Sequence, residues 1–153
     1  MGAFSGIYLN VWSRYWDRWF PRRNKAAFVH TSRANRTYNC IAWAAGDSSA
    51  WWEHTVGYRW PNAPRTPDLA SLIAVFVGLG FVVCADGALE AGVEKVAVYR
   101  DADGKWTHAA RQLESGEWTS KIGSLRDVRH ATPECLNSDL YGEVGGFLKR
   151  PRR

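Results

Sequence analysis

Two glycine-containing turns in the second half of the chain constrain its fold most strongly. Residues 101–104 (Asp-Ala-Asp-Gly) and 114–117 (Glu-Ser-Gly-Glu) each separate two segments rich in apolar and β-branched residues. Turns this short join antiparallel strands, because a parallel pair needs a crossover of a dozen or more residues. The segments 94–99, 105–113 and 118–122 therefore predict an antiparallel meander. Residues 26–30, 81–84 and 141–150 are further candidate strands.

The first half of the chain predicts helices. Residues 8–20 carry aromatic side chains at helical spacing, and residues 39–45 form a short apolar segment that stops at Gly46. A longer helix is expected after residues 66–68 (Thr-Pro-Asp), where threonine fits the N-cap and proline the first turn. Helices followed by an antiparallel sheet of about four to six strands are typical of the α+β class.

The cysteine pattern argues against structural metal or disulfides. The three cysteines at 40, 84 and 135 are widely spaced and form no Cys-x-x-Cys pair, so neither a zinc site nor a disulfide framework is indicated. The four histidines show no metal-ligand spacing either. We therefore expect no metal and no cofactor.

Charge and targeting signals suggest a location and weak partners. The formal net charge is +5 at pH 7, with basic clusters in residues 22–25 and 149–153, which predicts weak attraction to anionic polymers. The sequence has no nucleic-acid-binding motif, no Sec-type signal and no apolar run long enough to span a bilayer. We expect a cytoplasmic protein, or one exported by a dedicated secretion system.

The candidate chemistry centres on Cys40. It falls in the first turn of the helix predicted over residues 39–45, where unpaired N–H groups and the helix dipole favour a thiolate. A thiolate is the attacking species in cysteine catalysis, although a free cysteine in an apolar segment also fits a small buried hydrophobe. His108, on a predicted strand, would supply the base. Cysteine on a helix followed by histidine on a sheet is the chain order of papain-like enzymes.

A thiol hydrolase also needs a group that orients its histidine. A two-residue turn at residues 115–116 would place Leu113 opposite Trp118, so that Thr119 shares the face of His108. A single bulge would place Ser120 on that face instead. A dyad without a third member is compatible with the sequence as well. The candidates for the third group are Ser120, Thr119, Asp127 and His130.

Several residues are candidates for contacts with substrate. The Cys40 backbone N–H is the first donor expected for an oxyanion, with Asn39 or a side chain from residues 32–37 as the second. Gln112 is a further candidate for substrate or oxyanion binding. Within the long loop over residues 47–67, the aromatic part from Trp51 to Trp60 would wall the cleft, with Trp51 and Trp52 as candidates for substrate contact.

Five pieces of the sequence carry a resemblance to a bacterial domain family. They are residues 38–44 (Tyr-Asn-Cys-Ile-Ala-Trp-Ala), 107–112 (Thr-His-Ala-Ala-Arg-Gln), 118–123 (Trp-Thr-Ser-Lys-Ile-Gly), His130 and 141–142 (Tyr-Gly). That family is similar to amidase-like domains of polymorphic toxins, which belong to the papain-like clan with the NlpC-type cell-wall peptidases. The resemblance extends over about residues 31–150.

The resemblance implies roles for four residues. Cys40 would be the nucleophile and His108 the base, with a functional or structural part for Ser120 and His130. It also implies a peptide or peptidoglycan-like substrate and a toxin or effector context, in which an immunity or delivery protein would be a partner. Trp43 stands where the toxin motif has tyrosine, and Ile122 where it has tryptophan.

We therefore predict a thiol-dependent hydrolase, a peptidase or amidase that cleaves an amide bond through a Cys40 thioester. Residues 1–30 would form an N-terminal amphipathic helix and basic linker, and residues 31–153 a papain-like hydrolase domain, within one domain overall. One alternative is a catalytically silent papain-like domain that binds a protein or an anionic surface. A thiol acyltransferase, using the same residues, is the other.

Overall fold

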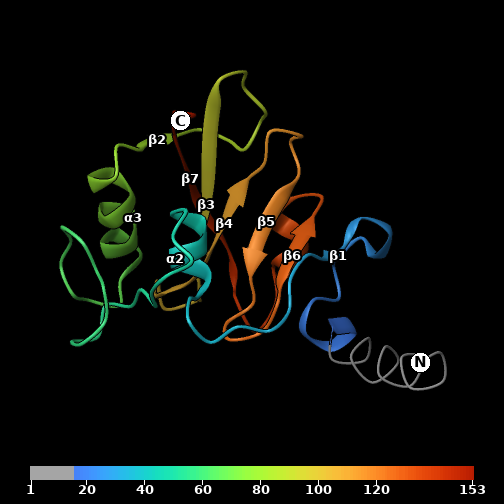
Figure 1. Ribbon diagram of the computed structural model, residues 1–153, viewed down its shortest axis with the longest axis horizontal. Coiled ribbons are helices and arrows are strands. Elements are labelled where there is room, and N and C mark those ends of the chain that lie inside the picture. Colours follow the sequence, from blue (N-terminus) through green and yellow to red (C-terminus); the bar gives the residue numbers. More distant parts are fainter. Residues whose placement is uncertain (1–15) are drawn as a thin grey trace.

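The protein is an α+β fold built on one antiparallel sheet (Figure 1), seen in a computed structural model that describes residues 16–153. The sheet has seven strands in the order β1-β6-β5-β4-β3-β7-β2. The strands are β1 (Val29–His30), β2 (Val82–Cys84), β3 (Val93–Arg100), β4 (Trp106–Gln112), β5 (Trp118–Lys121), β6 (Asp127–His130) and β7 (Glu143–Pro151). The helical elements are η1 (Lys25–Ala27), α2 (Cys40–Ala44), α3 (Leu69–Gly78) and η2 (Pro133–Leu136).

The α+β class and the meander β3-β4-β5 are as predicted, but the strand count exceeds the expected four to six. The strand that the sequence pattern missed is β6, whose residues Asp-Val-Arg-His include a single apolar side chain. It is nonetheless largely buried, because the Asp127 and His130 side chains have hydrogen-bond partners in the interior, Tyr38 and Ser120. Hydrophobic periodicity cannot detect such a strand.

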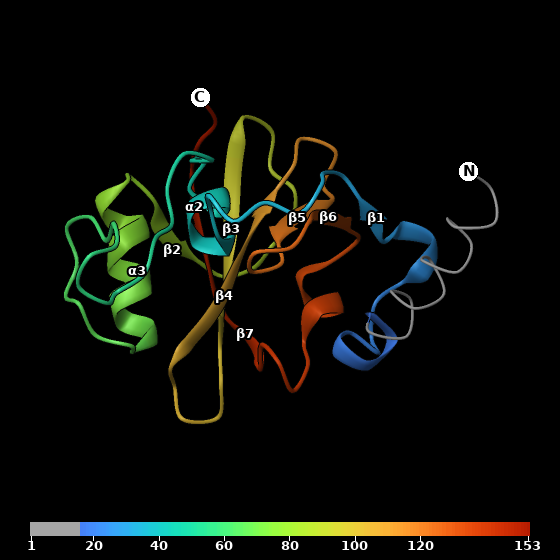
Figure 2. The ribbon, with the colours of Figure 1, turned by 60° about the horizontal axis from the view of Figure 1, so that its bottom comes forward.

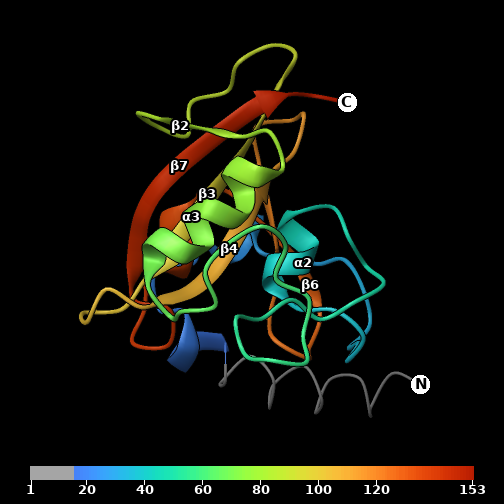
Figure 3. The ribbon, with the colours of Figure 1, turned by 90° about the vertical axis from the view of Figure 1, so that its left-hand side faces the viewer.

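The two faces of the sheet carry separate cores. Side chains on a strand alternate between faces, so Val96 and Val98 pack with α2 and α3 while Ala97 and Tyr99 point the other way. Figure 3 shows both helices on one side of the sheet. The opposite face is covered by side chains from the N-terminal segment and from η2, among them Trp16, Phe20 and Leu136.

The N-terminal segment belongs to the same packed unit. Trp16 to Trp19 form a helical turn, and Trp16 and Phe20 are fully buried. β1 then pairs antiparallel with β6. Residues 8–15 of the predicted N-terminal helix lie outside the described residues.

The helix α3 begins two residues later than its sequence signal predicts. Asp68 rather than Thr66 is the N-cap, and the Asp68 side chain makes no capping bond. The reason is tertiary: Asp68 bridges Lys105, and the Leu69 N–H donates to the Gly104 carbonyl at 3.0 Å. The β3–β4 turn therefore holds this stretch extended before the helix starts.

Gly142 offers a direct test of the turn before β7. Its φ is +70°, and a Cβ there would lie 2.0 Å from the Arg100 carbonyl oxygen, whereas Gly104 has φ +78° and open space around it. Gly104→Ala should cost about 1 kcal/mol through backbone strain alone. Gly142→Ala should cost at least about 3 kcal/mol because backbone must also move. Urea denaturation measures both; equal losses would contradict the close packing of the two chain segments.

Candidate active site

Asn39 builds the start of α2. Its Oδ1 accepts hydrogen bonds from the backbone N–H groups of Ala42 and Trp52, each at 3.2 Å, and its Nδ2 donates to the Trp52 carbonyl at 2.7 Å. These bonds cap the helix and dock the following loop. The side chain is buried and committed to these partners, so Asn39 positions the helix and is not the oxyanion donor that we expected.

The Cys40 thiol is buried at the first residue of α2, and the residue is 6% exposed. The backbone N–H groups of Ala109, Ile41 and Cys40 itself face the sulfur and favour a thiolate, but burial outweighs them and raises the pKa of Cys40 to about 11. The expectation that the helix start lowers this pKa is therefore wrong. At neutral pH Cys40 is a thiol.

His108, Ser120 and His130 form a continuous buried hydrogen-bond chain. The Ser120 Oγ lies 2.9 Å from the His108 Nε2 and 2.8 Å from the His130 Nε2. The His130 Nδ1 lies 2.8 Å from the Thr132 carbonyl oxygen. All three side chains are at most 1% exposed.

The Thr132 carbonyl determines where the protons of this chain lie. A carbonyl only accepts, so the His130 Nδ1 must donate and its Nε2, in the neutral ring, must accept from the Ser120 hydroxyl. The Ser120 oxygen is then an acceptor for the His108 Nε2–H. His108 therefore keeps a bare lone pair on Nδ1, and this buried atom has no hydrogen-bond partner among the described residues.

The aromatic surroundings of His108 favour its neutral form. The Tyr141 ring stacks on the imidazole, with centroids 4.1 Å apart and planes at 11°, and the Tyr99 ring meets it edge-on at 5.0 Å. Burial lowers the pKa of His108 well below its usual value, and the charge of a protonated His130 would lower it further. His108 is thus a neutral base with an available nitrogen.

The register between β4 and β5 decides which side chain reaches His108. Leu113 and Glu117 close the turn through a 2.8 Å backbone bond, and Gln112 pairs with Trp118. This is one residue away from the two-residue turn that we expected, so Ser120 instead of Thr119 shares the face of His108. The Thr119 Oγ1 accepts a bond from Trp43 Nε1 at 3.0 Å on the other face.

Cys40 and His108 approach β4 from different sides. His108 pairs with Tyr99 and lies on the face away from α2, whereas the Cys40 thiol contacts the N–H of Ala109, the next residue. No hydrogen bond joins Cys40 to His108 within residues 16–153. In that range β4 pairs with β5 only through Arg111 and Gln112. At Ala109, therefore, the backbone of β4 has no pairing partner on β5.

Lys121 is a charged group that the sequence analysis did not select. It is fully buried, and its Nζ donates to the Asn35 and Gly123 carbonyls, both at 2.6 Å. The ammonium also lies 4.8 Å from the Tyr38 ring centroid. Its charge favours the Cys40 thiolate. The sequence feature that could have identified Lys121 is its place within a predicted strand. A charge buried there is costly unless it has a role.

Three of the remaining candidates, Trp52, Gln112 and Asp127, have partners within the fold. Trp52 is 3% exposed and belongs to the core under α2, so the expectation that it walls a cleft is wrong. Trp51 is half-buried. The Gln112 Nε2 donates to the Gly87 carbonyl at 2.7 Å and ties down that loop. Asp127, the last candidate for the third group, accepts from the Tyr38 hydroxyl.

Residues 16–153 contain neither a metal-binding cluster nor a membrane-spanning helix. No group of three or more His, Cys, Asp or Glu side chains among residues 16–153 is arranged to hold a metal ion. No helix in the same range is long and apolar enough to cross a bilayer.

The ionisation of Cys40 can be measured by alkylation with iodoacetamide and mass spectrometry. Cys40 should react more slowly than the half-buried Cys84 at pH 7–9, and its rate should still rise near pH 11. Lys121→Met should slow Cys40 about three- to tenfold further by removing a nearby positive charge. A Cys40 that outreacts Cys84 at pH 7 would contradict the buried thiol.

Lys95→Met is the matched control for Lys121. Lys95 is as buried, but it lies on the other face, and its ammonium is neutralised by Glu90 at 2.7 Å and Asp86 at 3.4 Å. Its loss should lower stability without changing the pH profile of Cys40. A similar shift in both variants would mean that general loosening, not charge, controls the thiol.

Acid should destabilise the protein through the histidine chain. Burial lowers the pKa of His130 from about 6.5 to about 4, and the bond to Thr132 opposes this only in part. Because the folded state binds this proton less readily than the unfolded state, the fold is most stable above the unfolded pKa of about 6.5. The free energy of unfolding then falls by about 3 kcal/mol as the pH drops from about 6.5 to about 4. Urea titrations at these pH values should show this loss, and His130→Gln should show a flatter dependence. A wild-type profile without it would contradict the neutral buried imidazole.

Comparison with known proteins identifies the family. No curated protein and no solved structure matches the chain. One family model, described as "Domain of unknown function (DUF7689)", matches residues 29–149, from β1 into β7. Both Cys40 and the His108–Ser120–His130 chain fall inside the matched residues. The chain belongs to the DUF7689 family.

Proposed function

We propose that this protein is a thiol-dependent hydrolase of papain-like type that cleaves an amide bond through a thioester on Cys40. His108 would be the base, and Ser120 and His130 would position it. The observation that carries the proposal is the proton order of the buried chain, which leaves the His108 Nδ1 bare and without a partner. A buried nitrogen without a partner costs stability, and such costs concentrate at functional sites.

The proposed reaction starts from a neutral thiol and a neutral imidazole. As Sγ attacks the substrate carbonyl carbon, the thiol proton passes to the His108 Nδ1. The tetrahedral intermediate then breaks its C–N bond, and His108 returns the proton to the leaving amine. Water, deprotonated by His108, hydrolyses the thioester and regenerates the thiol. The N–H groups of Cys40, Ile41 and Ala109, which face the sulfur, are suitable donors for the oxyanion.

The burial of both groups adds a requirement. Cys40 is 6% exposed and His108 is fully buried under Tyr141, so substrate binding must open the site. The turn over residues 138–142 is the part that would move, because it holds the stacked ring. The reaction also requires the Cys40 thiol and the His108 Nδ1 to meet, and the part of β4 that lacks a β5 partner is where we expect them to do so.

The resemblance stated above supports a peptide or peptidoglycan-like amide as substrate, and a bacterial toxin or effector setting. The competing function is a catalytically silent domain that binds a partner. The burial of Cys40 and its pKa of about 11 favour that alternative, so the experiment must separate the two.

A peptide vinyl sulfone tests the proposal, because it brings its own electrophile and lets His108 act as base. We expect covalent labelling of Cys40 and cleavage of members of a peptide library, both lost in Cys40→Ser. His108→Ala should reduce both rates by about 10²–10⁴-fold, and Ser120→Ala should reduce them less. His54→Ala is the matched control, since His54 also packs against aromatic rings, Trp60 and Trp106. Absence of both labelling and cleavage in folded wild-type protein would reject the hydrolase and leave the binding module.

A further inference from the structure

A cavity of about 510 Å³ lies outside the residues that the proposed reaction uses. Its walls come from residues 18–22 of the N-terminal segment, residues 100–102 at the end of β3, and residues 137–143 before β7. Figure 2 shows the turn between β3 and β4 projecting beyond the other strands. The volume is in the range of pockets that hold small ligands.

Three guanidinium groups, two from the N-terminal segment and one from the end of β3, line this cavity without a carboxylate partner. Arg18, Arg22 and Arg100 form no ion pair among the described residues, in contrast to Arg23, which pairs with Asp17 at 2.9 Å. Residues 1–15 contain no Asp or Glu, so they offer these arginines no carboxylate side chain. Arginine forks are suited to binding carboxylates in a ligand.

Carboxylates line the same cavity. Asp139 and Glu143 are exposed and form no ion pair within residues 16–153. Asp101 is committed to its own turn, because its Oδ1 accepts from the N–H groups of Asp103 and Lys105. The three acidic and three basic side chains balance formally. A polyanion would meet the acids as well as the arginines, whereas a ligand with charges of both signs can satisfy both.

The cavity wall also covers the candidate base. Ser138 and Gly142 exchange two backbone hydrogen bonds, at 2.9 and 2.7 Å, and the turn that they close carries Tyr141. The Tyr141 ring stacks on His108, and the Thr107 hydroxyl donates to the Tyr141 carbonyl. A ligand in the cavity therefore contacts the turn that must move for His108 to become accessible.

We propose that this cavity binds a short peptide carrying at least one carboxylate and one ammonium group, held by the arginines and by Asp139 and Glu143. The statement that this cavity is the substrate subsite of the hydrolase rests on the proposed function. The statement that it binds such a peptide does not rest on it, because none of the residues that would hold the ligand takes part in the chemistry.

The experiment measures binding to full-length Cys40→Ala protein, in which hydrolysis cannot occur. The probe is a fluorescently labelled tetrapeptide with blocked ends that contains one Glu and one Lys. We expect saturable binding in fluorescence anisotropy, weakened about tenfold when Gln replaces either charged residue of the probe. Arg100→Gln and Glu143→Gln in the protein should weaken it similarly.

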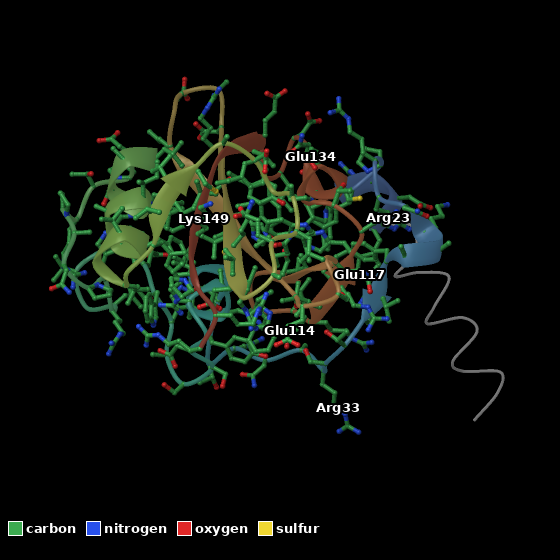
Figure 4. The ribbon with its side chains drawn as sticks, turned by 90° about the horizontal axis from the view of Figure 1, so that it is seen from above. Arg23, Arg33, Glu114, Glu117, Glu134 and Lys149 are labelled. Carbon is green, nitrogen blue, oxygen red and sulfur yellow. The ribbon has the colours of Figure 1, made fainter. Side chains whose placement is uncertain are left out.

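Matched substitutions away from the cavity provide the controls. Arg33 points away from the body of the protein in Figure 4, and the Glu114 side chain is 82% exposed. Arg33→Gln and Glu114→Gln should leave binding unchanged. Equal weakening by the control and cavity variants would show nonspecific charge attraction and overturn the assignment. Tighter binding of inorganic tripolyphosphate than of the peptide would overturn it as well.

The same measurements separate this assignment from the proposed function. Binding that depends on Arg100 and Glu143, combined with a Cys40 inert to the vinyl sulfone, would keep the site and reject the hydrolase. A reactive Cys40 with no binding of the probe, or with binding indifferent to the cavity variants, would keep the hydrolase and reject the site.

Discussion

The register between β4 and β5 is the constraint on which the candidate site depends. With Gln112 opposite Trp118, the side chains of His108, Ser120 and His130 all lie on one face. A shift by one residue would turn Ser120 to the other face and break the chain at its centre. This register is fixed by a three-residue turn between Leu113 and Glu117, which ends in Gly116 with φ +91°. A small turn on the surface thereby determines the chemistry of a buried histidine.

The ionisation of Cys40 shows two opposed effects of different size. Charge near a helix start is worth about 0.3–1 kcal/mol at ordinary sites. A shift in the Cys40 pKa from 9.0 to about 11 corresponds to about 3 kcal/mol in the opposite direction. Burial wins because the thiol lies in a core formed with Ile41, Ala42 and Ala109. A nucleophile in such a place needs a base at the moment of attack, which is what a neutral His108 would provide.

Much of the fold could be predicted from local signals. The two turns predicted the meander, and Gly46 correctly placed the end of the short helix, whereas Asn39, predicted as the first helical residue, is its N-cap. The strand β6 could not be found, because its burial rests on hydrogen bonds to residues distant in sequence, such as Tyr38 and Ser120. The start of α3 shifted for a similar reason, since the β3–β4 turn holds Asp68 extended.

Of the candidate site, residue types were easier to predict than their connections. Ser120 and His130 were among the candidates for the orienting group, and both bond in series with His108. Choosing between Ser120 and Thr119 required the register, which depends on a single residue of turn length. Asn39 and Trp52 were assigned to the cleft because polar and aromatic residues near a cysteine suggest one. Burial, which sequence alone does not give, places both in the interior.

The packing of residues 16–28 shows that the folded unit extends beyond the residues that the family model matches. The family match begins at Val29, the first residue of β1. Trp16 and Phe20 lie N-terminal to it and are buried on the sheet face that carries His108 and His130. A fragment cut at the family boundary would leave Tyr141 and Val128 without these covering rings. The folded unit of this protein therefore extends at least to Trp16, beyond the first residue that the family model matches.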